Sequence, residues 1–74
     1  MTRNQPLPTQ NDRRLLRLPE VRQKTGLSTS EIYRRMGRET FPPSVRIGPR
    51  QVAWDSHLID CWILVQLGEI PGEP

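Results

Sequence analysis

The sequence is poor in the residues that build disulfide frameworks, metal centres and catalytic sites. Its 74 residues include one cysteine, Cys61, and one histidine, His57. A single cysteine excludes an internal disulfide and fits a reducing compartment, and this pair does not supply the ligands of a zinc site. No nucleophile lies beside a base, and Asp55 and Asp60 fit helix capping and solvent roles. We therefore expect no metal, no cofactor and no enzymatic activity.

Aromatic residues and long apolar runs are also scarce. Aromatic residues make up 5% of the chain, and Trp54 and Trp62 fall on the apolar faces of their elements, which predicts core packing and not base stacking. No apolar run reaches the roughly 20 residues of a membrane span, and the N-terminus lacks the apolar core of a signal peptide. We expect a soluble cytoplasmic protein with neither a membrane partner nor a small-molecule ligand.

Arginine, in contrast, is abundant and unevenly distributed. Residues 13–54 contain ten basic and three acidic residues, whereas residues 55–74 contain four acidic residues and no basic one. The first part therefore carries +7 and the second −4. A basic region of this kind is suited to binding a polyanion, although a run of charge alone is usually a solvated surface. The charge becomes informative only in combination with the predicted fold.

The pattern predicts one folded domain, residues 13–67, between two flexible ends. Residues 1–12 are proline-containing and polar, with no helical or strand period, and are interpreted as an N-terminal arm. Residues 68–74, Gly-Glu-Ile-Pro-Gly-Glu-Pro, are interpreted as a C-terminal tail.

The first half of the domain has the signals of a helix-turn-helix. Leu15–Leu18 is a short extended piece that can pair as a third strand, and Pro19 suits the first position of a helix that ends near Thr25. Gly26 follows in the conformation that only glycine adopts cheaply. A Ser-x-x-Glu capping box, Ser28 with Glu31, begins a second helix that runs from Thr29 to Met36 or Gly37.

The faces of this second helix follow from its spacing. Ile32 and Met36, together with Leu27 from the turn, face the core. Thr29, Ser30, Tyr33, Arg34 and Gly37 then lie outward.

The second half predicts a β-hairpin and a third helix. Val45 and Ile47 alternate with polar residues, as do Val52 and Trp54, which predicts one apolar and one polar hairpin face. Gly48-Pro49-Arg50 forms the turn, so Arg50 lies at its tip. Asp55 or Ser56 caps a helix whose apolar positions are Leu58, Ile59, Trp62, Ile63 and Val65, and Gly68 ends it. The expected fold is mainly α with a small β-hairpin wing, a three-helix winged helix-turn-helix.

This fold predicts a DNA-binding surface on the second helix and the wing. Arg34 has the bidentate fork that reads guanine in the major groove, and Arg35 and Arg38 suit phosphates. Arg50 and Arg46 suit the minor groove. The other candidates are Ser28, Thr29, Ser30 and Tyr33 at the second helix, Gln51 on the wing, and Arg22 and Lys24 on the first helix as contacts to the DNA backbone.

Residues 13–63 resemble the AlpA family of phage and mobile-element regulators, which is similar to MerR-type and excisionase winged helices. The matching stretches are Arg14-Leu15-Leu16-Arg17-Leu18-Pro19-Glu20-Val21, Thr25-Gly26-Leu27-Ser28, Ile32-Tyr33-Arg34-Arg35, Thr40-Phe41-Pro42, Gly48-Pro49-Arg50, Val52-Ala53-Trp54 and Ile59-Asp60-x-Trp62. The resemblance implies that residues 28–35 form the recognition helix and that Arg46 to Gln51 form the wing.

Three residues depart from the family pattern. Glu39 stands where the family usually has glycine, Glu31 where a small hydroxyl residue is common, and Arg22 where an apolar residue is frequent. The first departure predicts a different exit from the second helix, the second favours capping over base contact, and the third thins the core under the first helix.

The resemblance implies a sequence-specific double-stranded DNA-binding protein of a bacterial mobile element or prophage, acting at the nucleoid. The family implies that it acts as an excisionase (also called a recombination directionality factor), as a transcriptional regulator, or as both. An integrase is a candidate partner. A single module reads few base pairs, so we expect several copies to associate head-to-tail on DNA and to bend it. The alternative is a protein-interaction adaptor that docks on an integrase or polymerase subunit, with DNA binding incidental.

Overall fold

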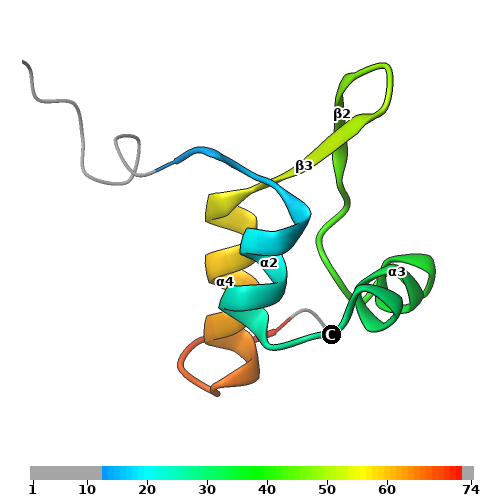
Figure 1. Ribbon diagram of the computed structural model, residues 1–74. Coiled ribbons are helices and arrows are strands. Elements are labelled where there is room, and N and C mark those ends of the chain that lie inside the picture. The colour runs from blue at the N-terminus through cyan, green and yellow to red at the C-terminus, as the bar shows by residue number, and fades with distance from the viewer. Residues whose placement is uncertain (1–12, 73–74) are drawn as a thin grey trace, which may run out of the picture.

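The computed structural model describes residues 13–72, which form three helices and a small antiparallel sheet. The elements in chain order are β1 (Leu15–Leu16), α2 (Leu18–Thr25), α3 (Thr29–Gly37), β2 (Val45–Gly48), β3 (Gln51–Asp55) and α4 (Ser56–Gln66). In Figure 1, α2 and α4 lie next to each other, whereas α3 and the β2–β3 hairpin project on the other side of the molecule. This arrangement confirms the expected winged-helix fold class. The expected arm, residues 1–12, lies outside the described residues, as do residues 73 and 74.

The sheet has the strand order β1-β3-β2, so β3 is its central strand. Leu15 pairs with Asp55 and Leu16 with Trp54, which confirms the expected third strand. Hydrogen bonds continue beyond β1, because the Ser56 amide donates to the Arg14 carbonyl at 2.8 Å and the Arg14 amide donates to the Ser56 hydroxyl at 2.7 Å. The chain before α2 is thereby fixed to the start of α4.

The prediction that one face of the hairpin is apolar is wrong. The observed register pairs Val45 with Ala53 and Arg46 with Val52, so Val45 lies on the opposite side of the sheet from Val52. Val45 and Ile47 remain 45% and 41% exposed. Burial does not alternate in β3, where Ala53 and Trp54 are both buried, and alternation within one strand does not determine which residues of two strands share a face. That depends on the register, which shifts between Arg46 and Gly48.

The core is built around the inner side of β3. Six buried residues from all parts of the domain form it, namely Leu16, Val21, Ile32, Phe41, Trp54 and Ile59. Leu27, Met36 and Trp62 pack against this cluster from its edge, and the Trp62 indole Nε1 donates to the Thr40 carbonyl at 3.0 Å. The predictions that both tryptophans belong to the core and that Ile32 and Met36 face inward are confirmed.

Capping of α2 differs in detail from the expectation. Arg17 is the N-cap, so Leu18 takes the first helical position and Pro19 the second. The Glu20 carboxylate accepts from the Arg17 amide at 3.1 Å, which is the backward half of a capping box. At the other end Gly26 has a φ of 76° and donates its amide to the Arg22 carbonyl, as predicted.

At α3 the predicted capping box forms only in part. The Ser28 hydroxyl accepts from the Glu31 amide at 3.2 Å, whereas the Glu31 carboxylate binds Arg34 and Arg35. The Glu31 side chain therefore pairs with arginines of α3 and does not bind the backbone amide of the N-cap residue.

The exit from α3 is strained. Glu39 has a φ of 61°, the one left-handed residue other than glycine among the described residues. Its amide donates to the Met36 carbonyl at 3.0 Å, and the Thr40 amide donates to the Arg35 carbonyl at 2.9 Å. These two bonds define a Schellman motif, in which glycine is the usual left-handed residue. Glu39 thus takes the left-handed position of this motif and places a Cβ where it is unfavourable.

The last helix begins and ends as predicted. Asp55 is its N-cap and accepts from the His57 amide at 2.8 Å, and Gly68, with a φ of 77°, follows its end. Residues 68–72 then fold back onto α4. This is seen at Gly72, where a Cβ would lie 3.0 Å from a methyl group of Val65. None of the helices in residues 13–72 is long and apolar enough to cross a membrane.

Replacing Glu39 with glycine should stabilise the protein. We expect Glu39→Gly to raise the free energy of unfolding by roughly 0.5–1 kcal/mol, since the left-handed penalty on a side chain exceeds the extra unfolded-state entropy of glycine. Urea denaturation followed by tryptophan fluorescence measures this change. Glu39→Ala is the control, because it removes the charge and keeps the Cβ. An equal gain in both variants would assign the effect to charge and contradict the conformational explanation.

The decrease in the free energy of unfolding at acidic pH should depend on Asp55. Hydrogen bonding from Arg13, at 2.6–3.2 Å, lowers the pKa of the Asp55 carboxyl below its usual value, and the His57 amide adds to this. The carboxylate therefore stabilises the fold above pH about 4, and this contribution is lost as pH falls through the lowered native pKa.

We expect the unfolding free energy of Asp55→Asn, which can still cap α4, to fall less steeply below pH about 4 than that of the unmodified protein. Chemical denaturation between pH 2 and 7 measures both slopes. Because the Arg13 pair is exposed, the difference should shrink in about 1 M salt. Identical slopes for the two proteins at low salt would contradict the prediction.

Candidate nucleic-acid interface

The interface is defined by α3 and the β2–β3 hairpin, which we call the wing. Both project from the same side of the molecule, and the body formed by α2 and α4 lies behind them (Figure 1). The winged helix-turn-helix class of protein is defined by this relation between a second helix and a following hairpin. Residues of both elements are thereby available to one extended surface.

The outward face of α3 contains the expected polar residues. Ser30, Tyr33 and Arg34 are exposed, whereas Thr29 is half-buried. Ser28 is exposed at the N-cap, but its hydroxyl already accepts from the Glu31 amide. Tyr33 is 44% exposed and its ring meets the Trp54 ring edge-on, with centroids 6.2 Å apart. The core thus supports one side of Tyr33 and leaves the other open.

Glu31 organises two of the predicted DNA contacts. One carboxylate oxygen binds Arg34, and the other accepts from Arg35 Nε at 2.9 Å. The hydrogen bond from Arg34 lowers the pKa of Glu31, with Arg35 contributing in the same direction, so this carboxylate stays ionised. Our sequence reasoning assigned Glu31 to capping alone. The i,i+3 and i,i+4 spacing of the Glu-x-x-Arg-Arg sequence is the signal that identifies these pairs.

Arg35 is directed toward α4 and not outward. Its guanidinium lies over the Trp62 ring, 5.9 Å from the centroid, and its side chain is only 34% exposed. The pairing with Glu31 and the cation–π contact both stabilise the position of α3 against α4. Arg35 therefore bridges two helices, although the sequence predicted a phosphate ligand.

The wing carries its candidates at the turn. Pro49 and Arg50 form the two-residue loop, which confirms that Arg50 lies at the tip. Arg46 donates to the Pro49 carbonyl at 3.3 Å, and Gln51 is exposed beside the turn. A Cβ on Gly48 would lie 2.9 Å from the Gln51 side-chain oxygen, so a larger residue at position 48 would displace the end of the Gln51 side chain.

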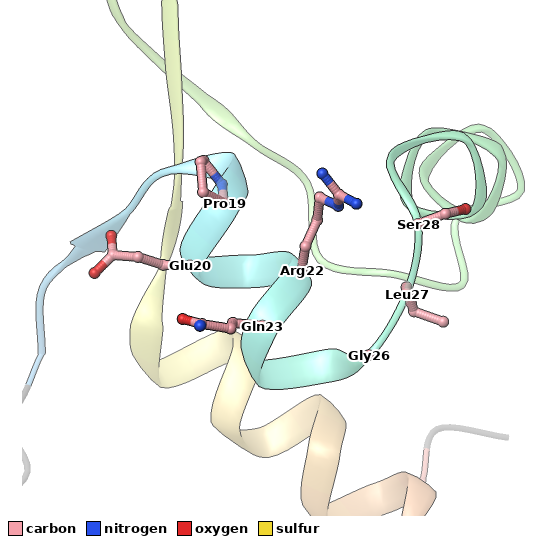
Figure 2. Close-up of a pocket in the computed structure, with 7 residues that line it drawn as sticks. All are labelled: Pro19, Glu20, Arg22, Gln23, Gly26, Leu27 and Ser28. Atoms are coloured by element: carbon pink, nitrogen blue, oxygen red, sulfur yellow. The ribbon is translucent and has the colours of Figure 1, made fainter.

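The two candidates on α2 have different surroundings. Lys24 Nζ is 2.9 Å from an Asp60 carboxylate oxygen of α4, which offsets its charge. Arg22 lines a cleft with Leu27 and Ser28 at the start of α3. Figure 2 shows its side chain pointing into the space between α2 and α3, whereas Glu20 and Gln23 point to the other side of α2.

Three of the predicted basic residues are free for a ligand. Within residues 13–72, Arg22, Arg38 and Arg50 make no ion pair and no side-chain hydrogen bond. They lie beside α3, at its C-terminal end and at the tip of the wing. Residues 13–72 contain no group of three or more side chains placed to bind a metal ion.

Comparison with known proteins agrees with this class. A family model described as prophage CP4-57 regulatory protein (AlpA) matches residues 14–67. The chain belongs to this AlpA family, as the resemblance of its motifs predicted.

Two curated relatives were compared. An uncharacterised protein, ORF88, of enterobacteria phage P4 is 40% identical over 67 residues, which cover 90% of this chain and 73% of the relative. The DNA-binding transcriptional activator AlpA of Escherichia coli K12 is 38% identical over 56 residues, which cover 68% of this chain and 80% of the relative. No solved structure matches the chain significantly.

Proposed function

We propose that this protein binds double-stranded DNA, with α3 in the major groove and the wing at the adjacent minor groove. The observation that carries the proposal is the projection of α3 and the wing from one side (Figure 1). Arg22 on α2, Arg38 at the end of α3 and Arg50 at the tip of the wing have guanidinium groups without a partner among residues 13–72. Free cations spread over such a surface can replace the counterions of several phosphates at once. The name of the E. coli relative, a DNA-binding transcriptional activator, supports the same activity.

On α3 we assign reading and anchoring to different residues. Ser30 and Arg34 are exposed in the first two turns, where side chains reach base edges, and the Arg34 fork matches guanine O6 and N7. Arg38 at the helix end and Arg22 on α2 suit phosphates on either side of the groove. Tyr33 and the backbone amides near Thr29 add backbone contacts.

On the wing, Arg50 is the residue that enters the minor groove. It lies at the tip and has no intramolecular partner among the described residues, and the negative potential of a narrow A·T-rich groove attracts a guanidinium. Arg46 and Gln51 support it from the sides of the turn.

The biological role we propose is regulation of a prophage or related mobile element at the bacterial nucleoid, by transcription, by excision together with an integrase, or by both. Family membership supports the regulatory part of this proposal. Excision requires that the protein also bends DNA, which minor-groove insertion by Arg50 promotes.

Binding measurements with arginine variants test the DNA proposal. A preferred duplex is first selected from a random-sequence library with the unmodified protein, and affinities for it and for a random duplex are measured by fluorescence anisotropy across salt concentrations. Arg38→Ala and Arg50→Ala should each reduce the log–log salt slope by about 0.9. Arg34→Ala should cost about 1–3 kcal/mol on the selected duplex and relax the preference at one base pair.

The control is Arg14→Ala, whose guanidinium is paired with Glu20 at 3.0 Å away from α3 and whose loss should leave the slope unchanged. Absence of binding to any duplex at low salt would overturn the DNA proposal. That outcome would favour the adaptor alternative, in which the exposed Val45 and Ile47 dock on an integrase or polymerase subunit.

We also propose that several copies bind side by side in one direction. A module of this size covers about 600–1,000 Å² of interface, which is little for selectivity against a genome. Two apolar surfaces of the chain support contacts between copies. One consists of Val45 and Ile47 on β2, and the other is a groove between α4 and the residues around Phe41 and Ile70. Because the two surfaces differ, contact between them joins copies head-to-tail.

A footprinting titration on the selected duplex, flanked by natural or repeated sequence, tests this arrangement. Protection should extend by successive adjacent sites as the protein concentration rises. Val45→Ser, which changes an exposed side chain on the wing, should leave the first site intact and weaken the extension. A single symmetric footprint that saturates with two copies would contradict the head-to-tail arrangement.

A further inference from the structure

Glu31 is the only acidic residue of α3, and it lies in the first turn of this proposed recognition helix. Both of its carboxylate oxygens are used, one by Arg34 and one by Arg35. Its side chain is 26% exposed. The trio therefore presents a net charge of +1 to a ligand, although it contains two arginines.

The carboxylate is fixed in this position by its second partner. Arg35 also lies over the Trp62 ring of α4, so it cannot move to a phosphate without losing contacts with two elements. Arg34 has no contact of this kind and is 57% exposed. Any DNA that draws Arg34 away from Glu31 to a phosphate leaves the carboxylate close to the polyanion with Arg35 as its remaining partner, which is less favourable than the intact trio.

A base edge does not impose this cost. An arginine has five N–H donors in a fixed fork, and Glu31 uses the NH2 group of Arg34, so donors remain for guanine while the ion pair is kept. The carboxylate can also accept from a cytosine amino group in the major groove. The pair is then compatible with a guanine next to a cytosine edge, whereas a phosphate beside the pair is repelled by the Glu31 carboxylate.

We propose that Glu31 is a specificity-determining residue, which holds Arg34 for base reading and lowers affinity for DNA of unrelated sequence. This inference rests on the proposed DNA binding. Its chemistry differs from that of the free residues Arg22, Arg38 and Arg50, which attract all duplexes alike. Glu31 therefore lowers general affinity and raises discrimination.

The test compares Glu31→Gln with the unmodified protein on a duplex selected from a random library and on a random duplex of equal length. Removing the charge should raise affinity for the random duplex about fivefold in ~0.15 M salt and steepen its salt slope by about 0.9, as expected for one more neutralised phosphate. Affinity for the selected duplex should not rise, so the ratio of the two affinities falls by at least that factor.

Two further variants make the result specific. Glu69→Gln makes the same change of charge in the C-terminal segment, outside α3 and the wing, and should leave the ratio unchanged. In an Arg34→Ala background, Glu31→Gln should no longer change the ratio, because Glu31 acts through Arg34. Melting temperatures of all variants establish that each is folded.

The outcomes separate this inference from the DNA proposal. If the unmodified protein binds no duplex, the proposed function is wrong. If it binds with selectivity and Glu31→Gln raises both affinities equally, Glu31 contributes only net charge and the inference is overturned. An unchanged affinity for the random duplex, or an effect that persists without Arg34, overturns it as well.

Discussion

The burial of Trp54 in the central strand is the constraint on which the rest of the structure depends. Trp54 is fully buried, lies opposite Leu16 of β1 and supports Tyr33 of α3 edge-on. Its indole Nε1 has no hydrogen-bond partner among the described residues, an arrangement that costs about 1–3 kcal/mol. Packing of so large a ring is worth about 3–5 kcal/mol, so burial is favoured. The same ring thereby links the wing, the first strand and the proposed recognition helix.

A second constraint is electrostatic and divides the arginines into two groups. Arg34 and Arg35 are held by Glu31, and Arg13 and Arg14 are held by Asp55 and Glu20 near β1. Such exposed pairs contribute little to stability, typically below about 1 kcal/mol. Their larger effect is to decide which guanidinium groups remain available to a polyanion. The net charge of the basic region therefore overstates the number of arginines that are free to bind.

Local signals account for the parts of the fold that were predicted correctly. Gly26 and Gly68 end helices because their left-handed conformation costs a glycine little, and Ser28 and Asp55 cap the helices that follow. The 3.6-residue spacing around Ile32 predicted which side of α3 is buried. At Glu39 the departure from the family pattern was visible, and only the structure showed that this side chain adopts a left-handed conformation.

The sequence by itself therefore determined the order of elements, the C-terminal ends of α2 and α4, the buried face of α3 and the uneven charge, because these depend on residues within a few positions of one another. Tertiary structure decided the hairpin register, which exposes Val45 and Ile47, since pairing two strands depends on how β3 packs in the core. It also decided that Arg35 is directed to Trp62 and Lys24 to Asp60. Those partners are 27 and 36 positions away in the chain, a separation at which no spacing rule identifies a contact.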